Sequence, residues 1–106
     1  AAHASWHNTM SIHGGKLQLC KIPLSNGRVK VKVRLDNRKS SHTHLGGVSR
    51  TRDGQRRSID FRTGAGRLSP TKSLIRKPGD YLSAGMGEPS GEGAGGDFLL
   101  SSVTRC

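Results

Sequence analysis

The chain has 106 residues, a formal net charge of +11 and an isoelectric point of about 10.9. Only 31% of its residues are hydrophobic and 4% are aromatic, whereas fifteen are glycine. This composition argues against a large hydrophobic core, and no apolar run is long enough to span a bilayer. A chain that is so short and so basic is expected to bind an anionic partner, phosphate above all.

The charge is distributed unevenly, and it divides the chain into four segments. Residues 1–15 form an arm without Lys, Arg, Asp or Glu, and residues 16–35 contain the clearest strand pattern. Residues 36–82 are rich in Arg and Gly, and residues 83–106 combine a Gly-rich linker with an acidic tail. Residues 16–77 have a net charge of +14 and residues 78–106 of −3, so the middle of the chain is expected to contact the partner.

The strongest structural signal is Asn26-Gly27 between two apolar stretches. This pair is favoured in a two-residue type I′ turn, so it predicts a β-hairpin over 16–35. The predicted register places six apolar residues on one face, pairing Leu24 with Val29, Ile22 with Val31 and Cys20 with Val33.

The other face of this hairpin is predicted to carry the cations Lys21, Lys30, Lys32 and Arg34, with Lys21 directly opposite Lys32. Like charges that face each other across two strands destabilise the pair, so this face is expected to contact an anion. The alternative is a solvated lysine face that protects an exposed strand from aggregation.

The segment after the hairpin loses all periodicity, and it contains six arginines that are candidates for phosphate binding: Arg50, Arg52, Arg56, Arg57, Arg62 and Arg67. Arginine makes bidentate contacts with phosphate and stacks on bases. With so little apolar area to bury, this segment is expected to become ordered only on its partner. The predicted fold class is therefore mostly irregular and extended, with one β-hairpin around Asn26-Gly27 and little independent core.

Few residues suggest other chemistry. His42 and His44 form an HxH pair, but zinc sites usually show further paired Cys or His spacings, so we expect polar loop residues and no metal or cofactor. No nucleophile has an evident partner, which predicts no catalytic residue and no small-molecule substrate. Cys20 and Cys106 lie far apart without a CxxC motif, which favours a reducing compartment or inert thiols.

Two short resemblances name environments in which such a chain could work. The strings His44-Leu-Gly-Gly47 and Ile59-Asp-Phe-Arg62 resemble the HxGGG…IDFKR region of a universal large-subunit ribosomal protein, although Val48 replaces the third glycine and the spacing is longer. The string Gly15-Lys-Leu-Gln-Leu19, with Ser41-His42 and Thr51-Arg-Asp-Gly54, is similar to parts of a small accessory subunit of mitochondrial complex I, without that family's proline-rich stretch.

The sequence therefore predicts a non-catalytic structural protein of a ribosome, which binds ribosomal RNA beside neighbouring ribosomal proteins. The absence of acidic residues before Asp36 favours a mitochondrion or a plastid. The alternative is a basic accessory subunit of a large mitochondrial membrane complex, such as respiratory complex I, bound to the other subunits of that assembly.

Overall fold

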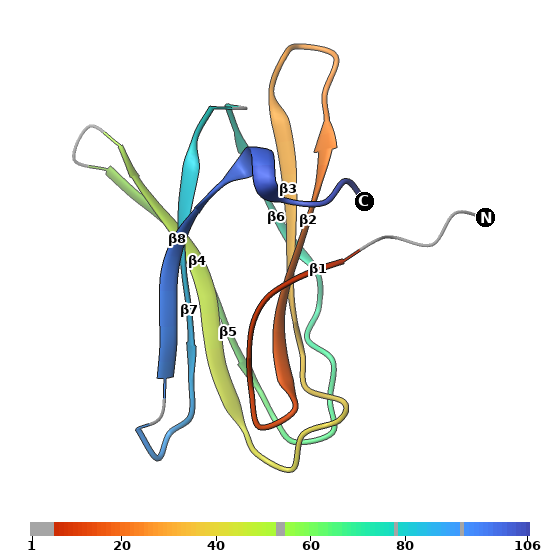
Figure 1. Cartoon of the computed structure of the whole chain (residues 1–106), viewed down its shortest axis with the longest axis vertical. Coiled ribbons are helices and arrows are strands. Elements are labelled where there is room, and N and C mark those ends of the chain that lie inside the picture. The colour runs from red at the N-terminus through yellow and green to blue at the C-terminus, as the bar shows by residue number, and fades with distance from the viewer. Residues whose placement is uncertain (1–5, 53–54, 78, 92) are drawn as a thin grey trace.

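The computed structural model describes residues 6–52, 55–77, 79–91 and 93–106, with the backbone alone at residues 51, 52 and 55–57. In these residues the chain forms eight β-strands and one short 3-10 helix (Figure 1). The elements are β1 (His7–Ile12), β2 (Gly15–Pro23), β3 (Val29–Asp36), β4 (His44–Arg52), β5 (Gln55–Thr63), β6 (Lys72–Arg76), β7 (Tyr81–Gly87), β8 (Gly93–Leu99) and η1 (Leu100–Ser102).

The strands build two antiparallel sheets of four strands each. Sheet A has the order β1-β2-β3-β6 and sheet B has the order β5-β4-β7-β8. The chain passes from one sheet to the other after β3, β5 and β6, so segments from all parts of the sequence meet at the ends of the sandwich. The last residues return to sheet A, where the Lys21 amide donates to the Thr104 carbonyl at 3.0 Å.

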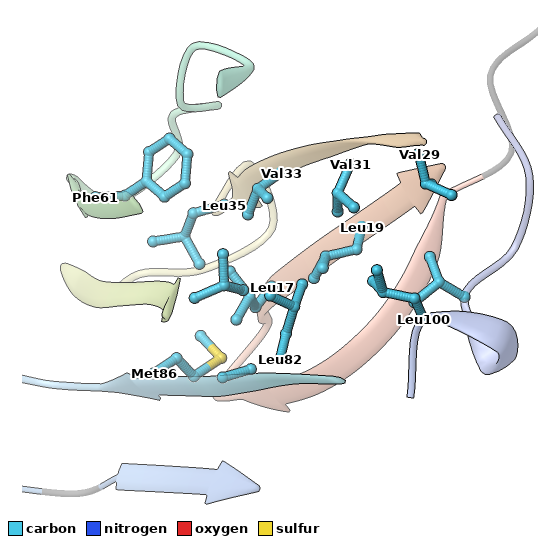
Figure 2. Close-up of a cluster of buried hydrophobic side chains, with 13 residues drawn as sticks. Leu17, Leu19, Val29, Val31, Val33, Leu35, Phe61, Leu82, Met86 and Leu100 are labelled. Atoms are coloured by element: carbon cyan, nitrogen blue, oxygen red, sulfur yellow. The ribbon is translucent and has the colours of Figure 1, made fainter. Parts of the chain in front are cut away.

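The core lies between the sheets, as Figure 2 shows. Strand β3 (VKVKVRLD) alternates strictly between buried and half-buried residues, as a strand with one covered face does. Its inward side chains pack with Leu17 and Leu19 of β2 against Leu82 and Met86 of β7. Leu100 of η1, only 1% exposed, closes one end of this core.

The predicted irregular and extended fold is wrong. The presumed arm contains β1, the Arg/Gly segment contains β4, β5 and β6, and the presumed linker and tail contain β7 and β8. An antiparallel sandwich needs an apolar residue only at every second position, so a chain with few hydrophobic residues can still fill a core. Backbone hydrogen bonds hold the glycine-rich strands in their sheet, and they require no side chain.

The predicted strands of the hairpin do pair, but their register differs by one residue. The structure pairs Cys20 with Lys32, Leu19 with Val33 and Pro23 with Val29. The reason is the turn: Gly27 adopts a positive φ of +79°, whereas Asn26 does not. The result is a three-residue loop with Gly27 in the left-handed region, instead of a type I′ turn. A shift of one residue exchanges the two faces of a strand, so Leu17 and Leu19 face the core while Cys20 and Ile22 face outward.

Positive φ at two successive turn residues, as a type I′ turn requires, occurs instead between β1 and β2. His13 and Gly14 have φ values of +44° and +84°, and Ile12 pairs with Gly15 across them. His13 is the one residue other than glycine with a positive φ in the described part of the chain. Gly14 is required here because a Cβ atom would lie 2.6 Å from the Lys39 carbonyl oxygen.

The expectation of two free thiols is also wrong, because Cys20 and Cys106 form a disulfide. Cys20 points away from the core on β2, where the C-terminal residues lie alongside it, and its partner lies 86 residues further along the chain. The tertiary structure brings together two cysteines that no sequence spacing connects.

Substituting Gly47 tests the close pairing of β4 with β5. A Cβ atom on Gly47 would collide with the carbonyl group of Ile59, so the two strands would have to separate. We expect Gly47→Ala to lower the free energy of unfolding by about 1–3 kcal/mol in urea denaturation. Gly96→Ala in β8 is the matched control, since a Cβ there meets nothing within 4 Å, and we expect a change of at most about 0.5 kcal/mol. Equal losses in the two variants would contradict this packing.

Replacing both cysteines by serine tests the disulfide. We expect the double variant to lose about 2–4 kcal/mol of unfolding free energy, because the crosslink restricts the unfolded chain over most of its length. Mass spectrometry of the unreduced, denatured protein should show no alkylation of Cys20 or Cys106, and full alkylation after reduction. Alkylation without reductant would show that the pair is not linked.

Candidate nucleic-acid interface

Cations gather on the outer face of sheet A, which points away from the core. Lys30, Lys32 and Arg34 occupy the positions of β3 between the buried valines and Leu35. Lys16 of β2 lies on the same face, two residues before Gln18, which pairs with Arg34. We call these four residues, Lys16, Lys30, Lys32 and Arg34, the basic face. Lys30, Lys32 and Arg34 form one row along β3, and Lys16 lies on β2 opposite Asp36.

An aromatic ring and two amides border one end of the basic face. The guanidinium carbon of Arg34 lies 4.3 Å from the centroid of the Trp6 ring, which is a cation–π contact. Arg34 also donates from Nε to Gln18 Oε1 at 2.7 Å, and Gln18 donates from Nε2 to Asn8 Oδ1 at 2.8 Å. Partial burial lowers the pKa of Arg34, but an arginine remains charged. Basic, aromatic and amide groups thus lie together at this end of sheet A.

Asp36 is an acidic neighbour of the basic face, and it has a partner of its own. Asp36 follows Leu35 at the end of β3, and its Oδ2 lies 2.9 Å from Arg38 Nη2. The hydrogen bond from Arg38 is the main reason that the pKa of Asp36 falls to about 2. Among the described residues, no carboxylate forms an ion pair with Lys30 or Lys32, so their charge is available to an anion.

The structure brings together three of the four cations that the sequence assigned to the hairpin. Lys21 is the exception, because the register shift turns it toward Val31 on the core side of the sheet. There its Nζ donates to the Leu100 carbonyl at 2.8 Å, so it anchors η1. The sequence pattern did not single out Lys16, Gln18 and Asn8. Lys16 and Gln18 could have been found by extending the inward–outward alternation of the hairpin to the start of β2.

Of the six arginines of the central segment, the structure describes three side chains, and Arg50 lies apart from Arg62 and Arg67, which line one depression. Arg50 is tied to Asp80 at 3.1 Å and lies 5.1 Å from the Tyr81 ring centroid. Arg62 lies on the outer face of sheet B, and Arg67 lies in the loop after β5. The side chains of the other three, Arg52, Arg56 and Arg57, lie outside the described residues. The described backbone from residue 50 to 52 and from 55 to 63 belongs to β4 and β5, in contrast to the irregular segment that the sequence predicted.

The outer face of sheet B differs sharply from the basic face. Gly47 pairs with Gly85, and Gly85 pairs with Gly95, across β4, β7 and β8. These three glycines form the floor of a shallow depression of about 720 Å³. Among the described side chains of this face, Asp60, Asp97 and Arg62 carry charge, which is a mixed set in contrast to the basic face.

A second cluster of polar side chains lies at one end of the sandwich. Ligand atoms of His13, His42 and Glu88 lie within 4.8 Å of one another, an arrangement that could hold a metal ion. His44 contacts the same carboxylate from the buried side. The HxH pair drew attention to His42 and His44, but nothing in the sequence connected them with Glu88.

Comparisons with protein families, with characterised proteins and with solved structures find no match to this chain. In the part of the chain that the structure describes, no helix is long and apolar enough to cross a membrane. The function must therefore be inferred from the geometry of the two sites.

Asp36 makes the stability of the fold depend on pH. A carboxyl group whose folded pKa lies below its ordinary value of 3.8 stabilises the fold above that pH. This stabilisation is lost as the pH falls from about 3.8 to about 2, where Asp36 becomes protonated. We expect Asp36→Asn to unfold with a smaller loss of stability across this window than the wild type, measured by urea denaturation at several pH values. Parallel curves for the two proteins would show that the Asp36–Arg38 pair does not contribute.

Proposed function

We propose that this protein is a non-catalytic RNA-binding component of a ribonucleoprotein, and that the basic face contacts the phosphate backbone. The observation that carries the proposal is the uncompensated charge of Lys30 and Lys32 beside Arg34 and Lys16 on a single sheet face. A row of cations at every second residue of a strand places successive charges about 6–7 Å apart. That spacing is close to the separation of neighbouring phosphates in an extended single strand.

RNA is favoured over duplex DNA by the groups that border the cations. Proteins that read single-stranded RNA on a sheet surface stack bases on aromatic rings and hydrogen-bond base edges and the 2′-hydroxyl. Trp6 can offer a ring to such a base, and the exposed Asn8 can offer its amide, which the buried Gln18 holds in place beside Arg34. A flat sheet face has no helix or ribbon to insert into a major groove.

The ribosome of an organelle is the setting that we propose for this activity. The support is the net charge of +11 and the resemblance of two strings to a ribosomal protein. These strings lie side by side in the fold, since Gly46 pairs with Phe61 and Gly47 with Asp60. The fold gives the protein its own core, so RNA would bind a preformed surface.

A second candidate is the accessory subunit of a respiratory assembly, and the disulfide favours it. Disulfides persist in oxidising compartments and are rare where thiols are kept reduced. Under this proposal the glycine-floored face of sheet B would pack against a neighbouring subunit. The basic face has no evident role in that case, which is why we place RNA binding first.

Paired charge removals test the RNA proposal. We expect Lys30→Gln with Lys32→Gln to weaken binding of a fluorescein-labelled single-stranded RNA at least tenfold in anisotropy titrations. The slope of log K against log[salt] should fall by about 0.7 for each lost phosphate contact.

The control removes the same charge elsewhere, by Arg62→Gln with Arg67→Gln. It should leave the salt slope unchanged, since these two arginines lie off the basic face. Equal effects of the two double variants would mean that net charge alone drives binding.

Sedimentation of a gentle lysate with and without ribonuclease distinguishes the ribosome from the respiratory assembly. Co-migration with a large complex that survives RNA digestion would contradict the ribosomal proposal and favour the respiratory assembly.

A further inference from the structure

Four segments that are distant in the sequence meet at one end of the sandwich. They are the turn between β1 and β2, the connection from β3 to β4, the first residue of β4 and the residue that follows β7. Each supplies one side chain to the cluster, in the order His13, His42, His44 and Glu88. None of these residues belongs to the basic face, so a site built from them is independent of RNA binding.

Three imidazole rings converge on the single carboxylate of Glu88. Oε1 lies 2.7 Å from His13 Nδ1 and 2.9 Å from His44 Nε2, and Oε2 lies 3.7 Å from His42 Nδ1. The carboxylate is only 5% exposed and His44 is fully buried, whereas His13 and His42 are about half exposed. The cluster thus has a buried inner half and an outer half that solvent can reach.

The hydrogen bonds of Asn37 determine which ring nitrogen of His44 carries the proton. Asn37 Nδ2 points at the carbonyl oxygens of His42, Thr63 and Gly64, so its Oδ1 must be the atom that faces His44. Oδ1 can only accept, and His44 Nδ1 therefore carries the proton that it donates at 2.6 Å. In the neutral ring, Nε2 then presents a lone pair to a carboxylate oxygen only 2.9 Å away.

Two lone pairs at this distance repel each other unless positive charge lies close to them, and a metal ion on the carboxylate would supply that charge. Carboxylates that bind metal ions are characteristically held in place by neighbouring groups, which orient them. His44, fixed by its hydrogen bond to Asn37, lies in such a position behind Glu88.

The backbone conformation at residues 13–15 allows the side chains of the cluster to approach one another. His13 reaches Glu88 from a turn in which it adopts a positive φ, a conformation that costs free energy outside glycine and that is concentrated at functional sites. Gly15 follows, and a Cβ there would lie 2.5 Å from His44 Nδ1 and 2.6 Å from Asn37 Oδ1. The sequence His-Gly-Gly at 13–15 therefore allows His44 and Asn37 to pack directly behind the cluster.

We propose that His13, His42 and Glu88, whose ligand atoms lie within 4.8 Å of one another, bind one first-row divalent metal ion, with His44 on the buried side of the carboxylate and with Zn²⁺ as the best-matched probe. Zinc takes four nitrogen, sulfur or oxygen ligands at about 2.0–2.2 Å, which separates neighbouring ligand atoms by about 3.3 Å. The distances from the Glu88 oxygens to the ring nitrogens of His13 and His42 lie on both sides of this value, at 2.7 and 3.7 Å, and water can complete the four ligands. The two half-exposed rings can adjust to it and leave a path for the ion. A bound ion would join sheet A to sheet B at this end of the sandwich.

The test is calorimetric titration of the metal-free 106-residue protein with Zn²⁺. We expect one ion per chain, a rise in melting temperature with added Zn²⁺, and a visible spectrum typical of four-coordinate cobalt when Co²⁺ replaces it. His13→Ala and His42→Ala should each weaken Zn²⁺ binding at least tenfold. His7→Ala is the matched control, because His7 lies in β1 away from the cluster, and it should bind as the wild type does.

Melting curves without metal check that each variant folds, which we expect because His13 and His42 are half exposed. Glu88→Gln preserves the shape of the side chain and removes its charge, so it provides a second test if an alanine variant unfolds. No Zn²⁺ binding by the wild type, or unchanged binding in the His13, His42 and Glu88 variants, would overturn the proposal. Loss of binding in His7→Ala as well would show adsorption to scattered histidines, which would also overturn it.

Discussion

The buried amide of Asn37 is the contact on which the arrangement of the two sheets depends. This residue directly follows β3 and is fully buried, yet every polar atom it has is paired. Its backbone bonds to Ser40, Gly66 and Arg67, while its side chain bonds to the end of β5 and to His44. A buried polar group without a partner costs several kcal/mol, so the loops around Asn37 must adopt the conformations that satisfy it. Through His44, the same network extends to Glu88 at the end of β7.

The two-sheet fold carries two surfaces with different chemistry, the basic face and the histidine cluster. The alternation of β3 turns valines inward, and it places cations outward with equal regularity, so the basic face is a direct consequence of the core. The histidine cluster has another origin, because it arises where the connections between the sheets meet. The first surface suits an extended polyanion, whereas the second suits a single small cation. The two surfaces share no residue.

Long-range contacts decide the parts of this fold that the sequence predicted least well. The sequence predicted the strand over Val29–Leu35 from its alternation and the turn at Asn26-Gly27. The register differs from the predicted one because Asn26 does not adopt a positive φ. The glycine-rich strands β7 and β8 looked like a linker because glycine has no intrinsic strand preference. They pair because neighbouring strands supply backbone partners and because Leu82 and Met86 reach the core. The small share of hydrophobic residues pointed to disorder, although a two-layer fold of this size buries few side chains.

By itself, the sequence determined the charge of this protein, the strand character of residues 29–35 and the presence of an outward row of Lys30, Lys32 and Arg34, because these properties are local. Only the tertiary structure decided that Lys21 turns inward, that Cys20 meets Cys106 and that three histidines share one carboxylate. These contacts join residues far apart along the chain, and their geometry depends on loop closure and sheet packing. A pattern of neighbouring residues carries no information about such distances.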